Sequence, residues 1–155
     1  MYTTIAKILE SGISKAEFIN LLNDENRDPE AVDFDDEDDP LIIRATGKIK
    51  KGDDLIDAHL RGRFTLPLTS VPGTIENLST DFAIYYCFEH RHRQSMPEDL
   101  QIKMKEDLKL LAGIQKGDVN PGIEPIDKRA DTIIKAEPST GKKVFGDDTF
   151  KDGTW

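Results

Sequence analysis

The stretch RGRFTLPL, from Arg61 to Leu68, marks the point where one long helix ends and the chain turns toward another. Pro67 disfavours the α conformation at Leu66, so the first helix must end about there. Val71-Pro72-Gly73 then opens the second helix. Before the turn, apolar or small residues recur at steps of three and four, which is the period of one helix face; they are Ile42, Ala45, Ile49, Gly52, Ile56 and Leu60. The turn is therefore expected to join two helices of one bundle.

Start and stop signals extend this pattern to five helices. Ser14 with Glu17, and Ser95 with Glu98, have the spacing of an N-terminal capping box. Asp39 is expected to cap the long helix, with Pro40 at its favoured first position. The expected ranges are 4–10, a helix opening at 14, 40–62 with a weak point at Gly52, 73–91 and 96–117. The predicted fold class is all-α, a small bundle of four to five helices with a long extended C-terminal tail.

The sequence changes character after Gly117, the expected end of the last helix. Residues 118–155 carry prolines and glycines with no sustained period, and isolated apolar residues stand among polar ones. Such a segment does not bury enough apolar area to offset its ordering entropy unless a partner supplies a surface. We therefore divide the chain into a helical domain, 1–117, and an extended or partner-ordered tail, 118–155.

The formal net charge of −9 is concentrated in one segment. Residues 24–39 contain ten acidic residues and one basic residue, Arg27, so the rest of the chain is formally neutral. Like charges at this density favour a solvated loop or a charged docking surface. Basic residues gather elsewhere, at Arg61 and Arg63 near the end of the long helix and at 90–93. The protein is therefore expected to be charge-polarised.

Composition also argues against several classes of protein. No apolar run approaches the ~18 residues of a membrane span, and the N-terminus lacks the pattern of a signal peptide. The single cysteine, Cys87, excludes an internal disulfide and favours a reducing compartment. A sequence pI of about 4.8, without an aromatic platform, argues against strong nucleic-acid binding.

The acidic segment partly matches a calcium-binding loop. Asp24, Asn26 and Asp28 supply oxygen ligands at its first, third and fifth positions. The sixth position requires glycine and holds Pro29, and the twelfth requires glutamate and holds Asp35. Two of the positions that define a calcium-binding loop therefore hold unsuitable residues, so the sequence assigns no metal ligand and no cofactor.

Two further patterns favour structural roles. Cys87, His90 and His92 lack the further ligands of a zinc site and fit a buried thiol followed by a basic helix end. Asp81, within an apolar helix, is the best-placed single acid, and an ion pair with Arg61 or Arg63 is favoured over catalysis. No nucleophile with a base and no phosphate-binding fingerprint is present, so an enzyme is not expected.

Four segments, in order, resemble the Mu-like phage and prophage head-completion family, whose members are neck or head–tail connector proteins. The segments are MYTTIAKILE, LIDAHLRGRFTLPL, ENLSTDFAIYYCFEHR and MKEDLKLLAGIQKGDV. The most specific part is LRGRFTLPL followed by a helix with Asp81, Ala83 and Tyr85. The resemblance covers about residues 1–120. Members often carry an acidic, calcium-loop-like linker at the place of 24–39, and this chain keeps the acids without the glycine.

The resemblance implies a structural protein without enzymatic activity that forms a ring between the portal and the tail, in the virion neck and, during assembly, in the host cytoplasm. Separate acidic and basic patches are compatible with this, because they permit a head-to-tail contact between copies. The expected partners are further copies of the chain, the portal protein and tail components, with a passing contact with packaged DNA and none with membrane. The candidate interface residues are Asp35, Asp36, Asp38, Arg61, Arg63, Arg91, Arg93, Val144, Phe145, Phe150 and Trp155.

Two other interpretations stay open at this point. One is a stand-alone calcium-binding module built on the acidic loop. The other is a helical adaptor that binds a partner through its tail without forming a ring. Calcium calorimetry would identify the first, and sedimentation as a monomer at high concentration would favour the second.

The tail hypothesis makes a direct prediction. Ending the chain after about Lys135 removes Val144, Phe145, Phe150 and Trp155, and should abolish assembly while leaving the helical domain folded. Sedimentation reports assembly, and far-ultraviolet circular dichroism reports the helices. Unchanged assembly of the shortened chain would refute the hypothesis.

Overall fold

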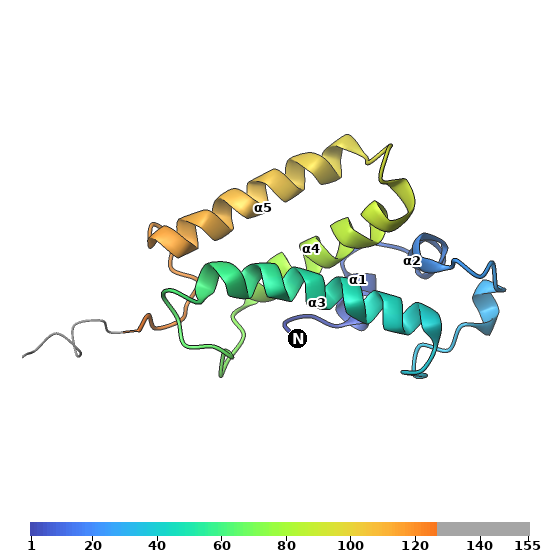
Figure 1. The fold of residues 1–155 in the computed structure, drawn as a ribbon, viewed down its shortest axis with the longest axis horizontal. Helices are drawn as coiled ribbons and strands as arrows, with labels where there is room; N and C mark the ends of the chain where they lie inside the picture. The colour runs from blue at the N-terminus through green and yellow to red at the C-terminus, as the bar shows by residue number, and fades with distance from the viewer. Residues whose placement is uncertain (127–155) are drawn as a thin grey trace, which may run out of the picture.

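The computed structural model describes residues 1–126 and is shown in Figure 1. These residues form an all-α bundle, as the sequence predicts, and no strand occurs among them. The helices are α1 (Ile5–Glu10), α2 (Lys15–Leu22), α3 (Pro40–Leu60), α4 (Gly73–His92) and α5 (Glu98–Lys116), with a short 3-10 turn, η1 (Pro29–Ala31), between α2 and α3.

Helix α4 is the centre of the bundle. It runs antiparallel to α3, and α5 lies along the same pair, while α2 packs near the end of α4 that carries His92 (Figure 1). Helix α1 lies further along α4, where Lys7 pairs with Glu76. Each of the other four helices contacts α4. Its buried positions include Ile75, Leu78, Phe82 and Ala83, and the adjacent Cys87 is also fully buried. This agrees with the apolar face that the sequence indicates for 73–91.

Helices α3 and α4 pack closely together at Gly52. A Cβ atom placed on Gly52 would lie 3.1 Å from the Cβ atom of Phe82 and 3.6 Å from the carbonyl oxygen of Ser79. The expectation of a weak point at Gly52 is wrong, because α3 is continuous from Pro40 to Leu60 and Gly52 is buried. The missing side chain allows the two helix backbones to pack together.

The buried apolar residues form two clusters along the α3–α4 pair. The first joins α1, α2 and the N-terminal half of α3 to α4, with Ile8, Phe18, Leu22, Leu41 and Ile49 among its members. The second joins the other half of α3 to α4 and α5, and includes Ile56, Leu60, Phe64, Phe82 and Leu111. Gly52 lies between Ile49 and Ile56, so the close helix contact falls where the two clusters meet.

A set of polar contacts fastens the N-terminus across this same region. The buried carboxylate of Asp53 accepts hydrogen bonds from the backbone amide of Tyr2, at 3.0 Å, and from the hydroxyl of Ser79, at 2.5 Å. The hydroxyls of Thr3 and Thr80 lie 2.7 Å apart in the interior. The first residues of the chain are therefore tied to both α3 and α4.

Local capping follows the sequence at two helices and departs from it at a third. The Ser14 hydroxyl accepts from the amide of Glu17 at 3.1 Å, and Asp39 caps α3 with Pro40 in the first turn. The capping box expected at Ser95 is wrong, because α5 begins at Glu98, after Pro97, without a side-chain cap. Proline disfavours a helical conformation at the preceding residue, which moves the start of the helix beyond Ser95.

Helix α5 ends as predicted at Gly117, which adopts a left-handed conformation with φ 96°. The chain then turns back onto the bundle. Val119 and Ile123 pack against the second apolar cluster, and Pro121 is buried. The amide of Ile126 donates to the carbonyl of Arg63 at 2.8 Å. Residues 118–126 therefore lie against the helical bundle.

The contact at Gly52 predicts opposite effects for two glycine substitutions in the same helix. Gly47→Ala should stabilise the protein by roughly 0.5–1 kcal/mol, because nothing lies within 4 Å of the added methyl group and alanine favours helix. Gly52→Ala should destabilise it by about 1 kcal/mol, because crowding against Phe82 outweighs the same propensity gain. Urea unfolding of the two variants measures the difference, and equal stabilisation by both would contradict the close packing.

Candidate assembly surfaces

The acidic segment begins with a loop that is closed by its one basic residue. The Arg27 guanidinium donates to both carboxylate oxygens of Asp39, at 3.0 and 2.6 Å. The side chain of Asn23 holds the backbone of Arg27 from both sides, accepting from its amide at 3.0 Å and donating to its carbonyl at 2.7 Å. Hydrogen bonding from Arg27 lowers the pKa of Asp39, and the amide of Leu41 also donates to that carboxylate.

A second arginine, Arg44 on α3, holds the other side of this loop. It donates to the two carboxylate oxygens of Glu25, at 2.8 and 2.5 Å, and to the carbonyl of Leu22, at 2.8 Å. The hydrogen bonds from Arg44 lower the pKa of Glu25. The first part of the acidic segment is therefore attached to the bundle by two arginines.

The basic end of α4 meets the same loop within one chain. The Nε2 atom of His90 lies 2.9 Å from a carboxylate oxygen of Asp24. Arg91 donates to the carbonyls of Asn20 and Asn23, at 2.9 and 2.8 Å, where α2 ends. A cation at a helix C-terminus complements the partial negative charge of its carbonyls. The structure thus brings together, inside a single subunit, two patches that the sequence separates by some sixty residues.

Apart from Arg63, the remaining candidate interface residues fall into three groups. Asp35, Asp36 and Asp38 are exposed on the second part of the acidic segment, and Arg93 is exposed just after α4. Arg61 is exposed beyond the far end of α3. Val144, Phe145, Phe150 and Trp155 lie outside the described residues.

Arg63 has a structural position. Its guanidinium lies directly against Gly117, where any side chain would collide with it. It therefore places positive charge at the C-terminus of α5, which the helix dipole favours. The backbone carbonyl of the same residue holds Ile126.

The exposed loop is shaped by its own aspartates. The carboxylate of Asp33 accepts from the amide of Asp35 at 2.9 Å, and that of Asp36 accepts from the amide of Asp38 at 3.0 Å. Such hydrogen bonds from a backbone amide to an aspartate two residues earlier stabilise turns rather than helices or strands. Among residues 1–126, the ion pairs of the acidic segment involve Asp24, Glu25 and Asp39, and none involves the aspartates between positions 33 and 38.

Two of the three oxygen ligands at calcium-loop spacing have other partners. Asp24 pairs with His90, and the carboxylate of Asp28 accepts from the amide of Glu30 at the start of η1. Asn26 has a left-handed backbone with φ 50°. Within the described part of the chain, no three histidine, cysteine, aspartate or glutamate side chains are grouped as a metal site would require.

The expected ion pair of Asp81 has a different partner. Its carboxylate lies 3.1 Å from the ammonium of Lys103 on α5, not beside Arg61 or Arg63. Lys103 also donates to Asp107 one turn further along α5, at 3.2 Å. Burial raises the pKa of Asp107. This group joins α4 to α5, and the i to i+4 spacing of Lys103 and Asp107 was a signal available in the sequence.

None of the helices in residues 1–126 is both long and apolar enough to span a lipid bilayer. The fold and its surface charges define a small all-α protein with an outward acidic loop at one end of its longest helix. Such a surface is suited to contacts between macromolecules.

Comparison with known families matches residues 2–135 to the family described as Bacteriophage Mu, Gp36. The match covers most of the chain, and the protein belongs to this family. The resemblance seen in the sequence is thereby confirmed as one to a Mu-like phage family. Membership supports a structural, head-related phage protein and a component of the virion. No curated protein matches the chain.

The double role of Asp39 predicts how stability depends on pH. Asp39→Ala removes both a helix cap and the partner of Arg27, and should cost about 2 kcal/mol at pH 7. Asp39→Asn keeps a capping oxygen and removes only the charge, so its cost should be smaller. Urea unfolding at pH 7 measures both values.

The acid limb of the stability profile, where the free energy of unfolding falls as the pH is lowered, separates the contribution of the helix cap from that of the ion pair with Arg27. The pKa of Asp39 is lowered in the folded state, so its carboxylate stabilises the fold above the ordinary aspartate pKa. That stability is lost as pH falls through the lowered value. Asp39→Asn should therefore flatten the acid limb, whereas Asp36→Asn on the exposed loop should leave it unchanged. Parallel acid limbs for wild type and Asp39→Asn would rule out the ion pair as a stabilising contact.

Proposed function

We propose that this protein is a neck or head–tail connector protein that assembles as a homo-oligomeric ring between the portal and the tail. The observation that carries the proposal is membership of the Bacteriophage Mu, Gp36 family over residues 2–135. The role is structural, without substrate chemistry. In the virion the ring occupies the neck, and before assembly the subunits are in the host cytoplasm.

The placement of charge supports a head-to-tail contact between copies. The carboxylates of Asp35, Asp36 and Asp38 project near the N-terminal end of α3, and Arg61 is exposed at its C-terminal end. A helix of 21 residues is about 31 Å long, so the two groups are separated by the length of the bundle. Two different surfaces that fit each other form a ring when the rotation between copies closes.

The division of the acidic segment supports the same arrangement. Asp24, Glu25 and Asp39 are paired inside the subunit with His90, Arg44 and Arg27. Asp35, Asp36 and Asp38 keep their carboxylates exposed, so they hold charge available to a neighbour. Acidic groups that face a channel would also let packaged DNA pass without adhering.

Neutralising the outward carboxylates tests this contact. The combined variant Asp35→Asn, Asp36→Asn and Asp38→Asn keeps side-chain oxygens for the loop turns and removes three charges. Three exposed ion pairs of about 0.5 kcal/mol each correspond to roughly tenfold in the dissociation constant of the assembly. Sedimentation of the full chain at several concentrations measures this constant.

The matched control is Glu10→Gln, Asp54→Asn and Glu106→Gln, which removes the same charge from exposed positions on α1, α3 and α5. It should assemble as the wild type does. Raising the salt concentration should weaken wild-type assembly steeply and the loop variant less so, because exposed charges are screened. A salt-insensitive oligomer, or equal effects of the two triple variants, would count against the electrostatic contact. A monomer at every concentration would favour the adaptor interpretation.

A further inference from the structure

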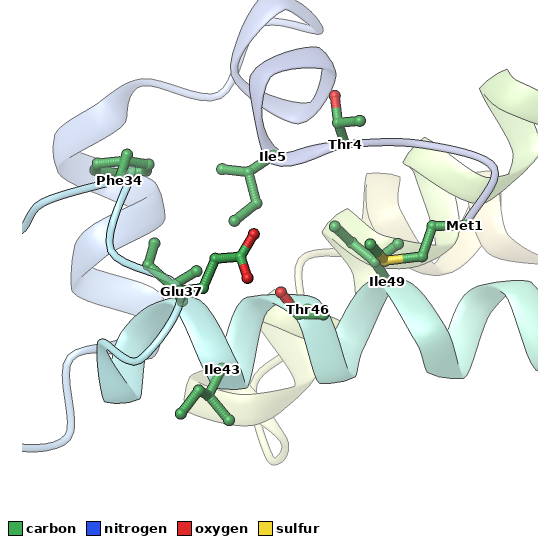
Figure 2. A pocket seen from close by; sticks show the side chains of 9 residues that line it. Met1, Thr4, Ile5, Phe34, Glu37, Ile43, Thr46 and Ile49 are labelled. Carbon is green, nitrogen blue, oxygen red and sulfur yellow. The ribbon is translucent and has the colours of Figure 1, made fainter.

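Beside the acidic loop the bundle has a hollow that we call the α1–α3 groove. It is about 450 Å³ in volume, within the range of sites that enclose small ligands or side chains. Its apolar surface comes from Ile5 on α1, Phe34 in the acidic segment, and Ile42 and Ile49 on α3. Figure 2 shows Ile5 and Phe34 on one side of this hollow and α3 on the other.

One carboxylate points into this apolar surface. Glu37 projects from the acidic loop into the space between Ile5 and Thr46 (Figure 2). Among the described residues, no ion pair or side-chain hydrogen bond involves Glu37. The exposed carboxylates of Asp35, Asp36 and Asp38 adjoin it in the sequence. The groove therefore combines apolar walls with negative charge, and suits a segment in which cationic and large apolar side chains are adjacent.

The chain itself contains such a segment. Lys142-Lys143-Val144-Phe145 places two ammonium groups directly before a β-branched and an aromatic residue. We propose that the α1–α3 groove of one copy binds Lys142–Phe145 of a second copy, with the lysines at Glu37 and the acidic loop and Val144 and Phe145 against the apolar walls. This inference rests on the proposed assembly and names the contact that joins neighbouring subunits.

The position at which the described chain ends favours a neighbour over the same copy. Ile126 is held by Arg63, beyond the C-terminal end of α3, whereas the groove lies along the N-terminal half of that helix. Binding its own groove would require the tail to run back along the bundle. The sixteen residues from 126 to 142 span up to about 55 Å when extended. That length exceeds the ~31 Å of α3 and is enough to reach the groove of a copy placed head-to-tail.

A second stretch of the sequence after residue 126 that combines apolar and basic residues fits the α1–α3 groove less well. Ile133-Ile134-Lys135 has one lysine and no aromatic residue. It follows Ile126 by only nine residues at most, and so remains within about 30 Å of its own bundle's exit point. The double lysine also matches the several carboxylates of the loop better than a single one does.

Cysteine cross-linking in the full chain tests the pairing. Chains with Thr46→Cys, in the groove, are mixed with chains carrying Val144→Cys and held in a glutathione redox buffer. Native Cys87 stays in both, since its burial raises the pKa of the thiol to about 12 and makes it unreactive. The matched control replaces Thr46→Cys by Ala58→Cys, an exposed position on the same helix.

The groove pair should give on the order of tenfold more inter-chain disulfide than the control pair, because docking raises the local thiol concentration. Adding Glu37→Gln should reduce the yield. Equal yields at Thr46 and Ala58 would overturn the inference. So would a higher yield with Ile134→Cys in place of Val144→Cys, or closure within one monomer when Thr46→Cys and Val144→Cys are on the same chain.

The mass of the uncross-linked particles in the same samples separates this inference from the proposed function. Oligomers without the specific cross-link would overturn the groove contact and leave the ring proposal standing. Monomers alone would overturn the ring proposal, and with it the contact between copies.

Discussion

The close contact of α3 and α4 at Gly52 is the constraint on which the rest of the structure depends. The absence of a side chain there lets the helix backbones approach across Phe82 and Ser79. The neighbouring Asp53 uses this proximity to bind Ser79 and the amide of Tyr2 together. The two apolar clusters extend from this contact in opposite directions, so both depend on the register that it sets.

That register also determines where the charged groups lie. Because α3 and α4 are antiparallel, the basic end of α4 reaches the loop that precedes α3. His90 and Arg91 can then hold the acidic loop and the end of α2. Asp24, Glu25 and Asp39 of the acidic segment are therefore part of the fold, and Asp35, Asp36 and Asp38 are left on the surface. The charge available for assembly is smaller and more localised than the total of −9 indicates.

Much of the helical architecture could be predicted from the sequence, because helix starts and stops depend on nearby residues. Ser14, Asp39 and Gly117 act locally and were assigned correctly. The capping box expected at Ser95 is absent, because Pro97 constrains the same few residues more strongly. The expectation of a weak point at Gly52 is wrong, because a glycine that weakens an isolated helix favours close packing when a second helix lies against it. The pairing of Asp81 with Lys103 depends on which face of α5 meets α4, and local spacing does not contain that information.

The same difference between local signals and contacts made by the tertiary fold applies to the surfaces. The sequence located the acidic segment, yet it did not show that Asp24, Glu25 and Asp39 pair with His90, Arg44 and Arg27, because these contacts depend on how the loop folds back onto the bundle. The groove between α1 and α3 arises from three separate segments and has no signature in any one of them.

In the proposed ring, different surfaces of identical subunits meet head-to-tail. Electron cryomicroscopy of the particle formed by the full 17.4 kDa chain at low salt tests this most directly. The expected result is a ring in which the acidic-loop end of each bundle faces the opposite end of the next. A two-fold symmetric dimer, in which the same surface of both copies meets, would contradict it.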